Sequence, residues 1–345
     1  MQVTVNASTQ YDVVIKSGAF DVCGEYIRKR FLPCKIALLT DDNVLALYSE
    51  KVKNSLTKRG FEVFVYSIKP GEASKNLTEY GNILSFLAEH AFTSSDVFLS
   101  LGGGVVSDLG GFVASTYHRG VAHVIMPTTL LSAIDASVGG KTAVNLPEGK
   151  NLAGTFYQPS LVICDVDTFT SLGKTELEEG YGELCKYSLL SGVIFEPDKI
   201  ANASDAENMV KTCVDFKAKT VQNDEFDKGE RRILNLGHTA AHAAERASDF
   251  KLPHGIAVYY GLKLTLSACR KLGVMSERDY ENCKKIMSAY DISTPFISDV
   301  KAIGRYIGAD KKTKGDKITL ALLRRAGEPF TAEFTLGEAV NLLCE

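Results

Sequence analysis

The sequence predicts an α/β domain followed by an all-α domain, and three observations support this prediction. The first half alternates short β-branched runs with amphipathic helical patterns, which is typical of βαβ units in a Rossmann-like, mostly parallel sheet. After residue 171 the pattern becomes a succession of helices. The chain has 345 residues, and a single hydrophobic core rarely grows to that size. We therefore expect an α/β domain at 1–171 and an α-helical domain at 172–345.

The elements of the first half follow one another at short intervals. The opening residues, MQVTV and YDVVIKSG, alternate with period two and predict a hairpin added to the sheet. Apolar, β-branched runs predict the other strands, and helical patterns lie between them. These strands are expected at 35–40, 61–68, 96–101, 121–126 and 161–166, with helices near 43–58 and 76–90.

The second half contains segments with helical periodicity, several opened by Ser, Thr or Asn and closed by Gly. The helices are expected at 175–190, 206–224, 237–250, 255–273 and 276–291. Near the end, KITLALLRR (317–325) and PFTAEF (329–334) predict a small pair of strands.

Composition narrows the class of protein. Hydrophobic residues make up 45% of the chain, charged residues 23%, and the net charge is −3, so nothing favours nucleic acid or an anionic membrane as a partner. The eight cysteines are scattered without a C-x-x-C pair, which argues against a disulfide framework and a cysteine-based zinc site. The chain lacks a signal-peptide pattern and an 18-residue apolar run. We expect a cytoplasmic protein.

A glycine-rich loop, LGGGVVSDLGG (101–111), follows the strand at 96–101 and leads into a helical pattern. Backbone N–H groups at such a helix start bind phosphate groups well. The dinucleotide fingerprint G-x-G-x-x-G from Gly102 would need Gly at the position of Ser107, and Asp108 is too close to be its acidic residue. The loop therefore indicates pyrophosphate binding in a related but different fold, with a plain tight turn as the alternative.

Other polar segments also follow strands: TDDN (40–43), PGEASK (70–75) and PTT (127–129). The carboxyl ends of parallel strands share one edge of the sheet, where open α/β sheets bind ligands. Several polar loops at one edge favour a nucleotide site more strongly than the glycine loop does alone.

Cations and polar residues cluster in the sequence beyond the fourth predicted strand. Lys141 and Lys150 lie among Gly, Thr and Asn and resemble ligand-facing groups, whereas most lysines are solvated surface charges. A phosphorylated or metal-bound small substrate would suit such a set. Its further members are Asp135, Asn151, Lys186, Lys217, Arg231 and the run at 310–312.

Histidines and one glutamate suggest a metal site in the helical half. Glu183 and Lys186 share a helix face, an arrangement that is most often a surface ion pair. His238 and His242 are four residues apart, and His254 follows at the next helix start. One carboxylate with two imidazoles is the ligand set of many catalytic zinc sites. The spacing favours His238 with His242, as in H-E-x-x-H, but leaves His238 with His254 open.

Taken together, PGEASK, GGGVVSDLGGFVAS, PTTLLSAIDASVGGKTAVN, GKNLAGTF and RRILNLGHTAAH, with HG at 254–255, resemble the 3-dehydroquinate synthase family along nearly the whole chain. The resemblance implies a homodimeric enzyme of the shikimate pathway with bound NAD and a divalent metal, zinc or cobalt. Its reaction converts 3-deoxy-D-arabino-heptulosonate 7-phosphate to 3-dehydroquinate and phosphate. The steps are transient oxidation, phosphate elimination, re-reduction and aldol closure.

The resemblance also assigns residues. The metal ligands would be Glu183, His238 and His254, with His242 as a proton carrier. Arg119 would reach the phosphate bound by the neighbouring subunit. NAD would contact Asp41, Asn43, Glu72, Lys75, Gly103, Gly104, Asp108, Thr128, Thr129, Lys150, Thr168 and Ser171. The substrate would contact Asp135, Lys141, Asn151, Lys186, Lys217, Arg231, Asn235 and a lysine of the pair Lys311 and Lys312, with Lys312 preferred.

Some residues depart from the family pattern. Ala240 and Ala241 replace an aromatic residue and a glycine, Ile256 replaces a glutamate, and Asp227 replaces another. An acidic partner of the metal site is therefore either missing or supplied elsewhere. The alternatives to the family reaction are another sugar-phosphate cyclase, such as one forming 2-deoxy-scyllo-inosose, a metal-dependent dehydrogenase of the glycerol dehydrogenase type, and a silent binding protein. Cys185, close to Glu183, is expected to be inert packing.

Overall fold

The computed structural model describes residues 1–296, 300–308 and 316–344 of the chain. Contacts divide it into two compact units, one formed by Met1–Leu172 with Ala201–Phe226 and the other by Gly173–Ile200 with Asp227–Glu345. The first unit therefore includes helix α7 (Ala203–Asn223), which packs against strand β1 (Gln2–Val5). The predicted ranges, 1–171 and 172–345, place this helix in the second domain instead. The compact units therefore differ from the predicted ranges mainly in the position of α7.

The first unit is built on a seven-stranded sheet in the order β1-β2-β9-β6-β5-β3-β4. Strand β1 is antiparallel to β2, and every other neighbouring pair is parallel. The five strands β3, β4, β5, β6 and β9 follow the order 2-1-3-4-5, which is a common doubly wound arrangement. This confirms the predicted mostly parallel sheet with an N-terminal hairpin. The strand bounds are β2 Tyr11–Ile15, β3 Lys35–Asp41, β4 Glu62–Ile68, β5 Val97–Gly102, β6 Ala122–Pro127 and β9 Leu161–Cys164.

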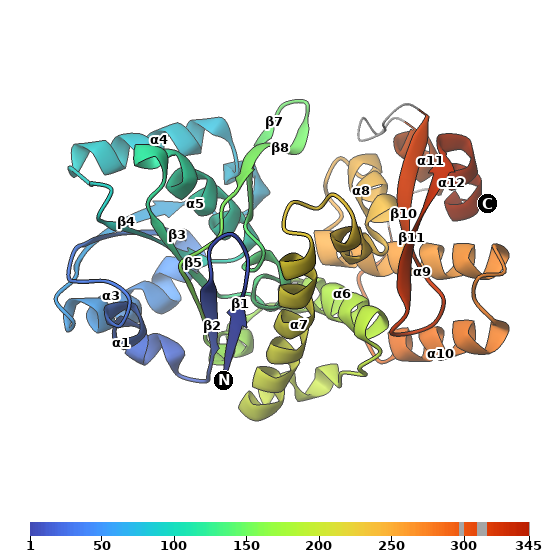
Figure 1. The fold of residues 1–345 in the computed structure, drawn as a ribbon, viewed down its shortest axis with the longest axis horizontal. Coiled ribbons are helices and arrows are strands. Elements are labelled where there is room, and N and C mark those ends of the chain that lie inside the picture. The colour runs from blue at the N-terminus through green and yellow to red at the C-terminus, as the bar shows by residue number, and fades with distance from the viewer. Residues whose placement is uncertain (297–299, 309–315, 345) are drawn as a thin grey trace. The chain divides into compact units, whose positions relative to one another are not determined.

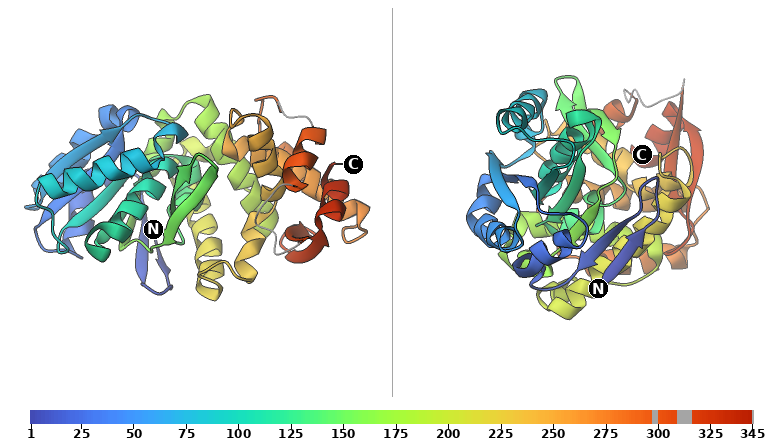
Figure 2. Two further views of the ribbon diagram at one scale, coloured as in Figure 1. Left: turned by 90° about the horizontal axis from the view of Figure 1, so that it is seen from above. Right: turned by 60° about the vertical axis from the view of Figure 1, so that its left-hand side comes forward.

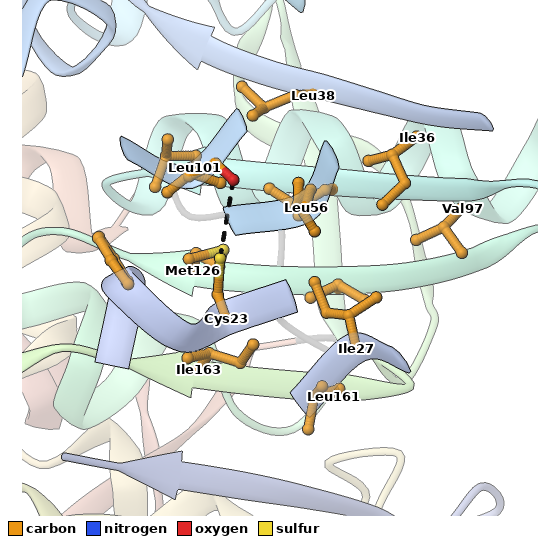
Figure 3. Packing of buried hydrophobic residues seen from close by; sticks show 14 of the residues in the cluster. Cys23, Ile27, Ile36, Leu38, Leu56, Val97, Leu101, Met126, Leu161 and Ile163 are labelled. Carbon is orange, nitrogen blue, oxygen red and sulfur yellow. Dashed lines mark hydrogen bonds between the residues drawn. The ribbon is translucent and has the colours of Figure 1, made fainter. Parts of the chain in front are cut away.

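Helices cover both faces of this sheet (Figure 1, Figure 2). On one face, Cys23, Ile27 and Leu56 pack against Ile36 and Leu38 and their neighbours (Figure 3). On the other face, the alternate residues of the same strand pack against further helices, because successive side chains of a strand point to opposite sides. The covering helices are α1 Cys23–Arg28 and α3 Glu50–Thr57 on the first face, and α4 Leu77–Glu89 and α5 Gly104–Thr116 on the second.

A hairpin of β7 (Lys141–Leu146) and β8 (Gly149–Phe156) extends from the first unit (Figure 1). The hairpin was not predicted, because this segment is rich in Gly and Asn. Its strand pairing also shifts register between Val144 and Leu146. The hairpin packs on α5 through β7. It therefore gives Lys141, Lys150 and Asn151 fixed positions on strands rather than in a loop.

The second unit is mainly helical and confirms the predicted helices of this part of the chain. It also contains the predicted terminal pair of strands, which is antiparallel. Two nine-residue helices, α11 and α12, were not predicted, since short segments give a weak periodic signal. The elements are α6 Lys174–Ser191, α8 His238–Ala247, α9 His254–Lys271, α10 Glu277–Ser288, α11 Val300–Gly308, β10 Lys317–Leu323, β11 Pro329–Thr335 and α12 Leu336–Cys344. None of the helices in the described ranges has the length and apolar character that crossing a membrane requires.

Candidate active site

The predicted cofactor residues of the first unit lie where the parallel strands end. Asp41 ends β3, and its carboxylate accepts hydrogen bonds from the backbone N–H groups of Asn43 and Val44, both at 3.0 Å. Thr128 and Thr129 follow β6 directly. Strands on the two sides of β3 are reached by connections in opposite directions, so a topological switch point lies between β3 and β5. Nucleotides bind at such switch points in open α/β sheets.

The glycine-rich turn connects β5 to α5 at this same edge. Helix α5 begins at Gly104, and its N-cap residue, Gly103, has no side chain to satisfy the first backbone N–H groups. A Cβ added at Gly103 would lie 3.2 Å from the methyl carbon of Thr129, so a side chain there would crowd the neighbouring turn. The turn is therefore open to a negatively charged group at the start of a 13-residue helix.

The next turn along this edge follows β9. Thr168 is 1% exposed, and its hydroxyl donates to the backbone oxygen of Asp165 at 2.8 Å. Ser171 donates to the backbone oxygen of Thr168 at 2.8 Å and lies 2.6 Å from the hydroxyl of Tyr48. Both side chains therefore hold the 166–171 turn in place against the rest of the first unit.

A polar network surrounds Lys75, whose residue is 4% exposed. Its ammonium group lies 2.5 Å from the carboxylate of Asp108 and 2.6 Å from the amide oxygen of Asn151. Asn145, which the sequence analysis missed, donates from its amide nitrogen to Glu72 at 2.7 Å and accepts from the backbone N–H of Asn151 at 2.9 Å. The 72–75 turn, the start of α5 and the β7–β8 hairpin are thus joined by direct hydrogen bonds.

A second polar pair in the first unit joins Lys217 of α7 to Asp135. The lysine ammonium donates to the backbone oxygen of Asp135 at 2.8 Å and also forms an ion pair with its carboxylate. The two side chains are 8% and 16% exposed, so the pair is largely removed from water. Lys141 is exposed at the start of β7, and Lys150 is half-buried on β8.

Arg119 lies in a short turn after α5 and has a φ of 64°. The preceding residue, His118, has a φ of 48°, so two successive residues without glycine's freedom adopt the left-handed conformation. Such a conformation persists only where the surroundings hold it, and here the ring of His118 lies 3.3 Å from the backbone oxygen of Phe92.

The second unit brings together Glu183 of α6, His238 of α8 and His254 of α9. One carboxylate oxygen of Glu183 lies 3.4 Å from Nε2 of His238 and 3.2 Å from Nε2 of His254. His242 instead groups with Glu245 and His254, within 4.8 Å of one another. The i, i+4 pair favoured by spacing is therefore divided: His238 lies with Glu183 and His254, and His242 lies beside them.

Both histidines near Glu183 have their other ring nitrogen engaged. Nδ1 of His238 lies 3.2 Å from the backbone oxygen of Leu236, and Nδ1 of His254 lies 3.5 Å from the carboxylate of Glu245. An oxygen of either kind accepts a hydrogen bond from an Nδ1–H group, and a proton on Nδ1 leaves Nε2 of each ring as the unprotonated nitrogen when the ring is neutral. Glu245, 3% exposed, is a second residue that the sequence analysis did not single out.

Close helix crossings explain why these side chains meet. A Cβ on Gly182 would lie 1.8 Å from the backbone oxygen of Gly255, so α6 and α9 touch through their backbones beside Glu183 and His254. A Cβ on Gly261 would lie 2.1 Å from the backbone oxygen of Gly237, beside His238. Each of the three residues has a glycine as its sequence neighbour, and only glycine permits such an approach.

The close approach of α8 and α9 at Gly237 and Gly261 explains the small residues between His238 and His242. Ala240 and Ala241 are 2% and 0% exposed, and the backbone nitrogen of Ala241 would lie 3.1 Å from a Cβ on Gly261. Helix α8 therefore presents small side chains where α9 approaches it. Ile256 is also fully buried, so apolar packing occupies the position where the family commonly has a glutamate.

Burial and charge set the electrostatics of the cluster. The Lys186 ammonium lies 2.5 Å from Glu183, and both side chains are 1% exposed, so the interpretation as a surface ion pair is wrong. Burial would raise the pKa of Glu183, but Lys186 and His238 outweigh it and hold this pKa well below the usual value. Burial would lower the pKa of His254, but Glu183 and Glu245 raise it to about 10.

The remaining predicted residues of the second unit lie in and after a short helical turn, Glu230–Asn235. Arg231 is 1% exposed and is among the largest fully buried side chains, whereas Asn235 is partly exposed. Cys185 is fully buried, and burial raises the pKa of its thiol. Lys311 and Lys312 lie outside the described residues.

Sequence comparison decides the family. Residues 65–179 match the family model of the 3-dehydroquinate synthase N-terminal domain, and residues 180–313 match that of the C-terminal domain. The chain is 38% identical to the 3-dehydroquinate synthase of Streptococcus mutans over 353 aligned residues, with 99% of both chains covered. It is 40% identical to that of Clostridium acetobutylicum, with 96% of each covered. The chain belongs to the 3-dehydroquinate synthase family.

Several solved structures share the fold of this member of the 3-dehydroquinate synthase family. A 2-deoxy-scyllo-inosose synthase complexed with carbaglucose-6-phosphate, NAD⁺ and Co²⁺ matches with a TM-score of 0.90 at 22% identity, covering 100% of this chain and 99% of that one. The 2-epi-5-epi-valiolone synthase from Streptomyces hygroscopicus, with NAD⁺ and Zn²⁺ bound, matches with a TM-score of 0.86 at 22% identity, covering 99% and 98%. A glycerol dehydrogenase from Schizosaccharomyces pombe matches less well, at 0.67 and 16% identity with 96% and 87% covered.

Proposed function

We propose that this protein is a 3-dehydroquinate synthase that converts 3-deoxy-D-arabino-heptulosonate 7-phosphate to 3-dehydroquinate and phosphate, using NAD and a divalent metal. The family membership supports the reaction, since relatives of that name are 38–40% identical over nearly the whole chain. The observation that carries the proposal in the structure is the meeting of Glu183, His238 and His254, because one carboxylate and two imidazoles could hold the divalent metal that the proposed reaction uses.

The geometry of this cluster fits a divalent metal. Ligand atoms about 2.0–2.2 Å from a tetrahedral zinc ion lie roughly 3.3–3.6 Å from one another. The distances of 3.4 and 3.2 Å from Glu183 to the two Nε2 atoms are close to that range. The engaged Nδ1 atoms hold both rings in the tautomer that leaves Nε2 available, as is usual for metal-binding histidines. The carboxylates that favour a proton on His254 would equally favour a cation beside it.

When bound, the metal would polarise substrate oxygens as a Lewis acid, and NAD would supply a reversible hydride acceptor. Within this division of labour, Glu183, His238 and His254 would hold the metal, and Glu245 would orient His254. His242, next to them but outside the ligand set, would carry a proton. Lys186 would keep Glu183 ionised, which the low pKa of that carboxyl already favours.

For the cofactor, we propose the strand-end residues of the first unit. Gly103 and Gly104 would receive the pyrophosphate at the start of α5. The other contacts would come from Asp41, Asn43, Glu72, Lys75, Asp108, Thr128, Thr129, Lys150, Thr168 and Ser171. Most of these residues follow strands at one edge of the seven-stranded sheet, and Lys150 lies on β8 of the hairpin; the shared edge supports this assignment.

For the substrate, we propose a set of cations and polar groups. Lys141, Arg231 and Asn235 would position the phosphate, so that they contribute mainly orientation and charge stabilisation. The other contacts would come from Asp135, Asn151, Lys186, Lys217 and Lys312. Burial of Arg231, Lys186 and Lys217 supports a role beyond surface charge, and Lys186 and Lys217 are held in place by ion pairs with Glu183 and Asp135.

A homodimer in which Arg119 reaches the neighbouring subunit's phosphate, and a cytoplasmic location, complete the proposal. The dimer can be tested by light scattering and by mixing Arg119→Ala with His242→Ala protein. Recovery of activity in the mixture would support a contribution across the interface, because each mixed dimer can contain one site with both residues intact. Two inactive proteins that stay inactive after demonstrated subunit exchange would contradict it.

The decisive experiment for the reaction is incubation of the purified protein with the heptulosonate phosphate, NAD and metal, before and after chelation. We expect one phosphate and one dehydroquinate per substrate, no net NADH, and loss of turnover on chelation. Steady NADH formation from glycerol would instead indicate a dehydrogenase. Turnover of a hexose 6-phosphate, without turnover of the heptulosonate, would indicate another sugar-phosphate cyclase.

A further inference from the structure

Asn145, on β7, makes hydrogen bonds to three residues that the proposed function assigns to ligands. Its amide nitrogen donates to the carboxylate of Glu72 at 2.7 Å. Its amide oxygen accepts from the backbone N–H of Asn151 at 2.9 Å. Its own backbone N–H donates to the backbone oxygen of Lys75 at 2.8 Å. One side chain and its backbone therefore join the 72–75 turn to the β7–β8 hairpin.

The two side-chain bonds require an amide at this position. Glu72 presents a carboxylate, which can only accept when ionised, and the Asn151 backbone presents an N–H, which can only donate. Asparagine offers a donor and an acceptor at the end of a short side chain, whereas aspartate lacks the donor and aliphatic residues lack both. The chemistry of the two partners therefore explains asparagine at position 145.

The hydrogen bond with Asn145 also stabilises the backbone conformation of Asn151. Its φ is 56°, in the left-handed region that most residues avoid, and the bond to Asn145 holds its backbone there. In this conformation the side-chain oxygen of Asn151 accepts from Lys75 at 2.6 Å, and Lys75 also pairs with Asp108. Loss of Asn145 would therefore release both the carboxylate of Glu72 and the Lys75–Asn151 contact.

We propose that Asn145 is a positioning residue that couples the NAD-binding turn to the substrate-binding hairpin. The inference rests on the proposed function, in which Glu72 and Lys75 contact NAD and Asn151 contacts the substrate. Asn145 acts by holding these residues in place, so its loss weakens NAD binding and raises the KM for the substrate. The effect on kcat at saturating ligands is smaller, because every group assigned to ligands is still present.

The first test is Asn145→Asp, which keeps the shape and the acceptor but replaces the donor by a second carboxylate facing Glu72. We expect the dissociation constant for NAD, measured by calorimetry, to rise on the order of tenfold, as one lost charge-assisted hydrogen bond implies. Asn208→Asp is the matched control, since Asn208 is exposed on α7 and donates to the backbone oxygen of Ser204. The control should bind NAD as the unmodified protein does.

The second test restores the hydrogen bond with its polarity reversed. In the double variant Asn145→Asp with Glu72→Gln, the glutamine amide can donate to the new carboxylate. We expect the double variant to bind NAD more tightly than the two single effects predict when added. Simple additivity would overturn the proposal, because the restored hydrogen bond would then contribute nothing to NAD binding.

A third variant covers the case in which Asn145→Asp does not fold. Asn145→Ala removes both side-chain bonds without adding charge, and it should raise the NAD dissociation constant and the substrate KM together. Unchanged values in this variant would also overturn the inference. NAD binding by the unmodified protein separates the two claims: its absence contradicts the proposed function, whereas normal NAD binding by the position-145 variants contradicts only the role of Asn145.

Discussion

The strand-end cluster of the first unit and the histidine cluster of the second are built in opposite ways. In the first, residues from successive strand ends reach one edge of the sheet, and hydrogen bonds such as those of Asn145 hold them there. In the second, helices α6, α8 and α9 meet through glycine backbones, and the site has little freedom to adjust. The first cluster therefore depends on side-chain partners, whereas the second depends on backbone spacing.

The largest effect is expected from removing a proposed metal ligand. His238→Ala should abolish metal retention after dialysis, measured by elemental analysis, because the Glu183 carboxylate loses one of its two imidazole partners. His242→Ala should keep the metal and lose turnover, since its ring groups with Glu245 rather than Glu183. Loss of metal in both variants would show that the two histidines share one role. NAD binding should be unchanged in both variants, because the strand-end cluster of the first unit is held by its own contacts.

A smaller but still large effect is expected from Gly255→Ala, which alters spacing without touching a ligand. The new Cβ would lie 1.9 Å from the backbone oxygen of Glu179, so α6 and α9 must separate. We expect metal affinity to fall at least tenfold, on the scale seen when a ligand's supporting contacts are lost. Cobalt titration followed by visible absorption would measure it.

Gly337→Ala serves as the control for that prediction, because a Cβ at Gly337 on α12 meets nothing within 4 Å. Alanine is the better helix former by about 1 kcal/mol, so the control should retain metal and its stability should not fall. Unchanged cobalt affinity in Gly255→Ala would mean that the helices repack without moving the ligands, and the contrast between the two clusters would be lost.

Glu245→Gln tests whether the histidine cluster also depends on side-chain partners. The amide keeps an acceptor near Nδ1 of His254 but removes the charge 3.5 Å away. Changes of this kind typically cost about 10- to 100-fold in metal affinity. Cobalt affinity equal to that of the unmodified protein would indicate that Glu245 does not orient His254.

The smallest effect concerns stability. Glu178 is 2% exposed and accepts hydrogen bonds from the backbone N–H and hydroxyl groups of Ser293 and Thr294. Burial would raise the pKa of Glu178, but these bonds outweigh it and hold the pKa below its usual value. A lowered native-state pKa contributes stability that is present above the unfolded-state value and is lost as the pH falls through the native value.

Glu178→Gln should therefore lower the free energy of unfolding by about 2 kcal/mol at neutral pH, the scale of hydrogen bonds to a charged group. The difference from the unmodified protein should shrink as the pH falls below about 4.5, where the carboxyl of the unfolded chain is protonated. Urea unfolding at several pH values would measure it. A difference that stays constant across this range would contradict the assigned pKa.

Much of the fold follows from local sequence patterns. The strands and the larger helices carry strong periodicity, and strand ends are visible as polar breaks, so the polar edge of the sheet could be predicted. The β7–β8 hairpin could not, because Gly and Asn interrupt its alternation. The placement of α7 depends on its contacts with β1, which no local pattern contains.

The sequence predicted the types of residue in the candidate site better than it predicted which of these residues contact one another. Spacing along one helix favoured His238 with His242, but helix crossings bring His254 to Glu183 instead. Asn145 and Glu245 were missed because a single Asn or Glu gives no signal until its neighbours in space are known. One signal was present in the sequence: Gly182, Gly237 and Gly255 each adjoin a proposed ligand.

The assignment of α7 to the first unit has a consequence for how the protein is made. Residues 173–200 of the second unit are synthesised between two parts of the first. On the ribosome, the first unit cannot be completed until Phe226 has emerged, although its sheet strands are all present by Cys164. A truncation after residue 172 would yield a sheet domain lacking its last helix and Lys217. Synthesis in this order therefore delays completion of the first unit until residues 201–226, which follow a segment of the second unit in the chain, have been made.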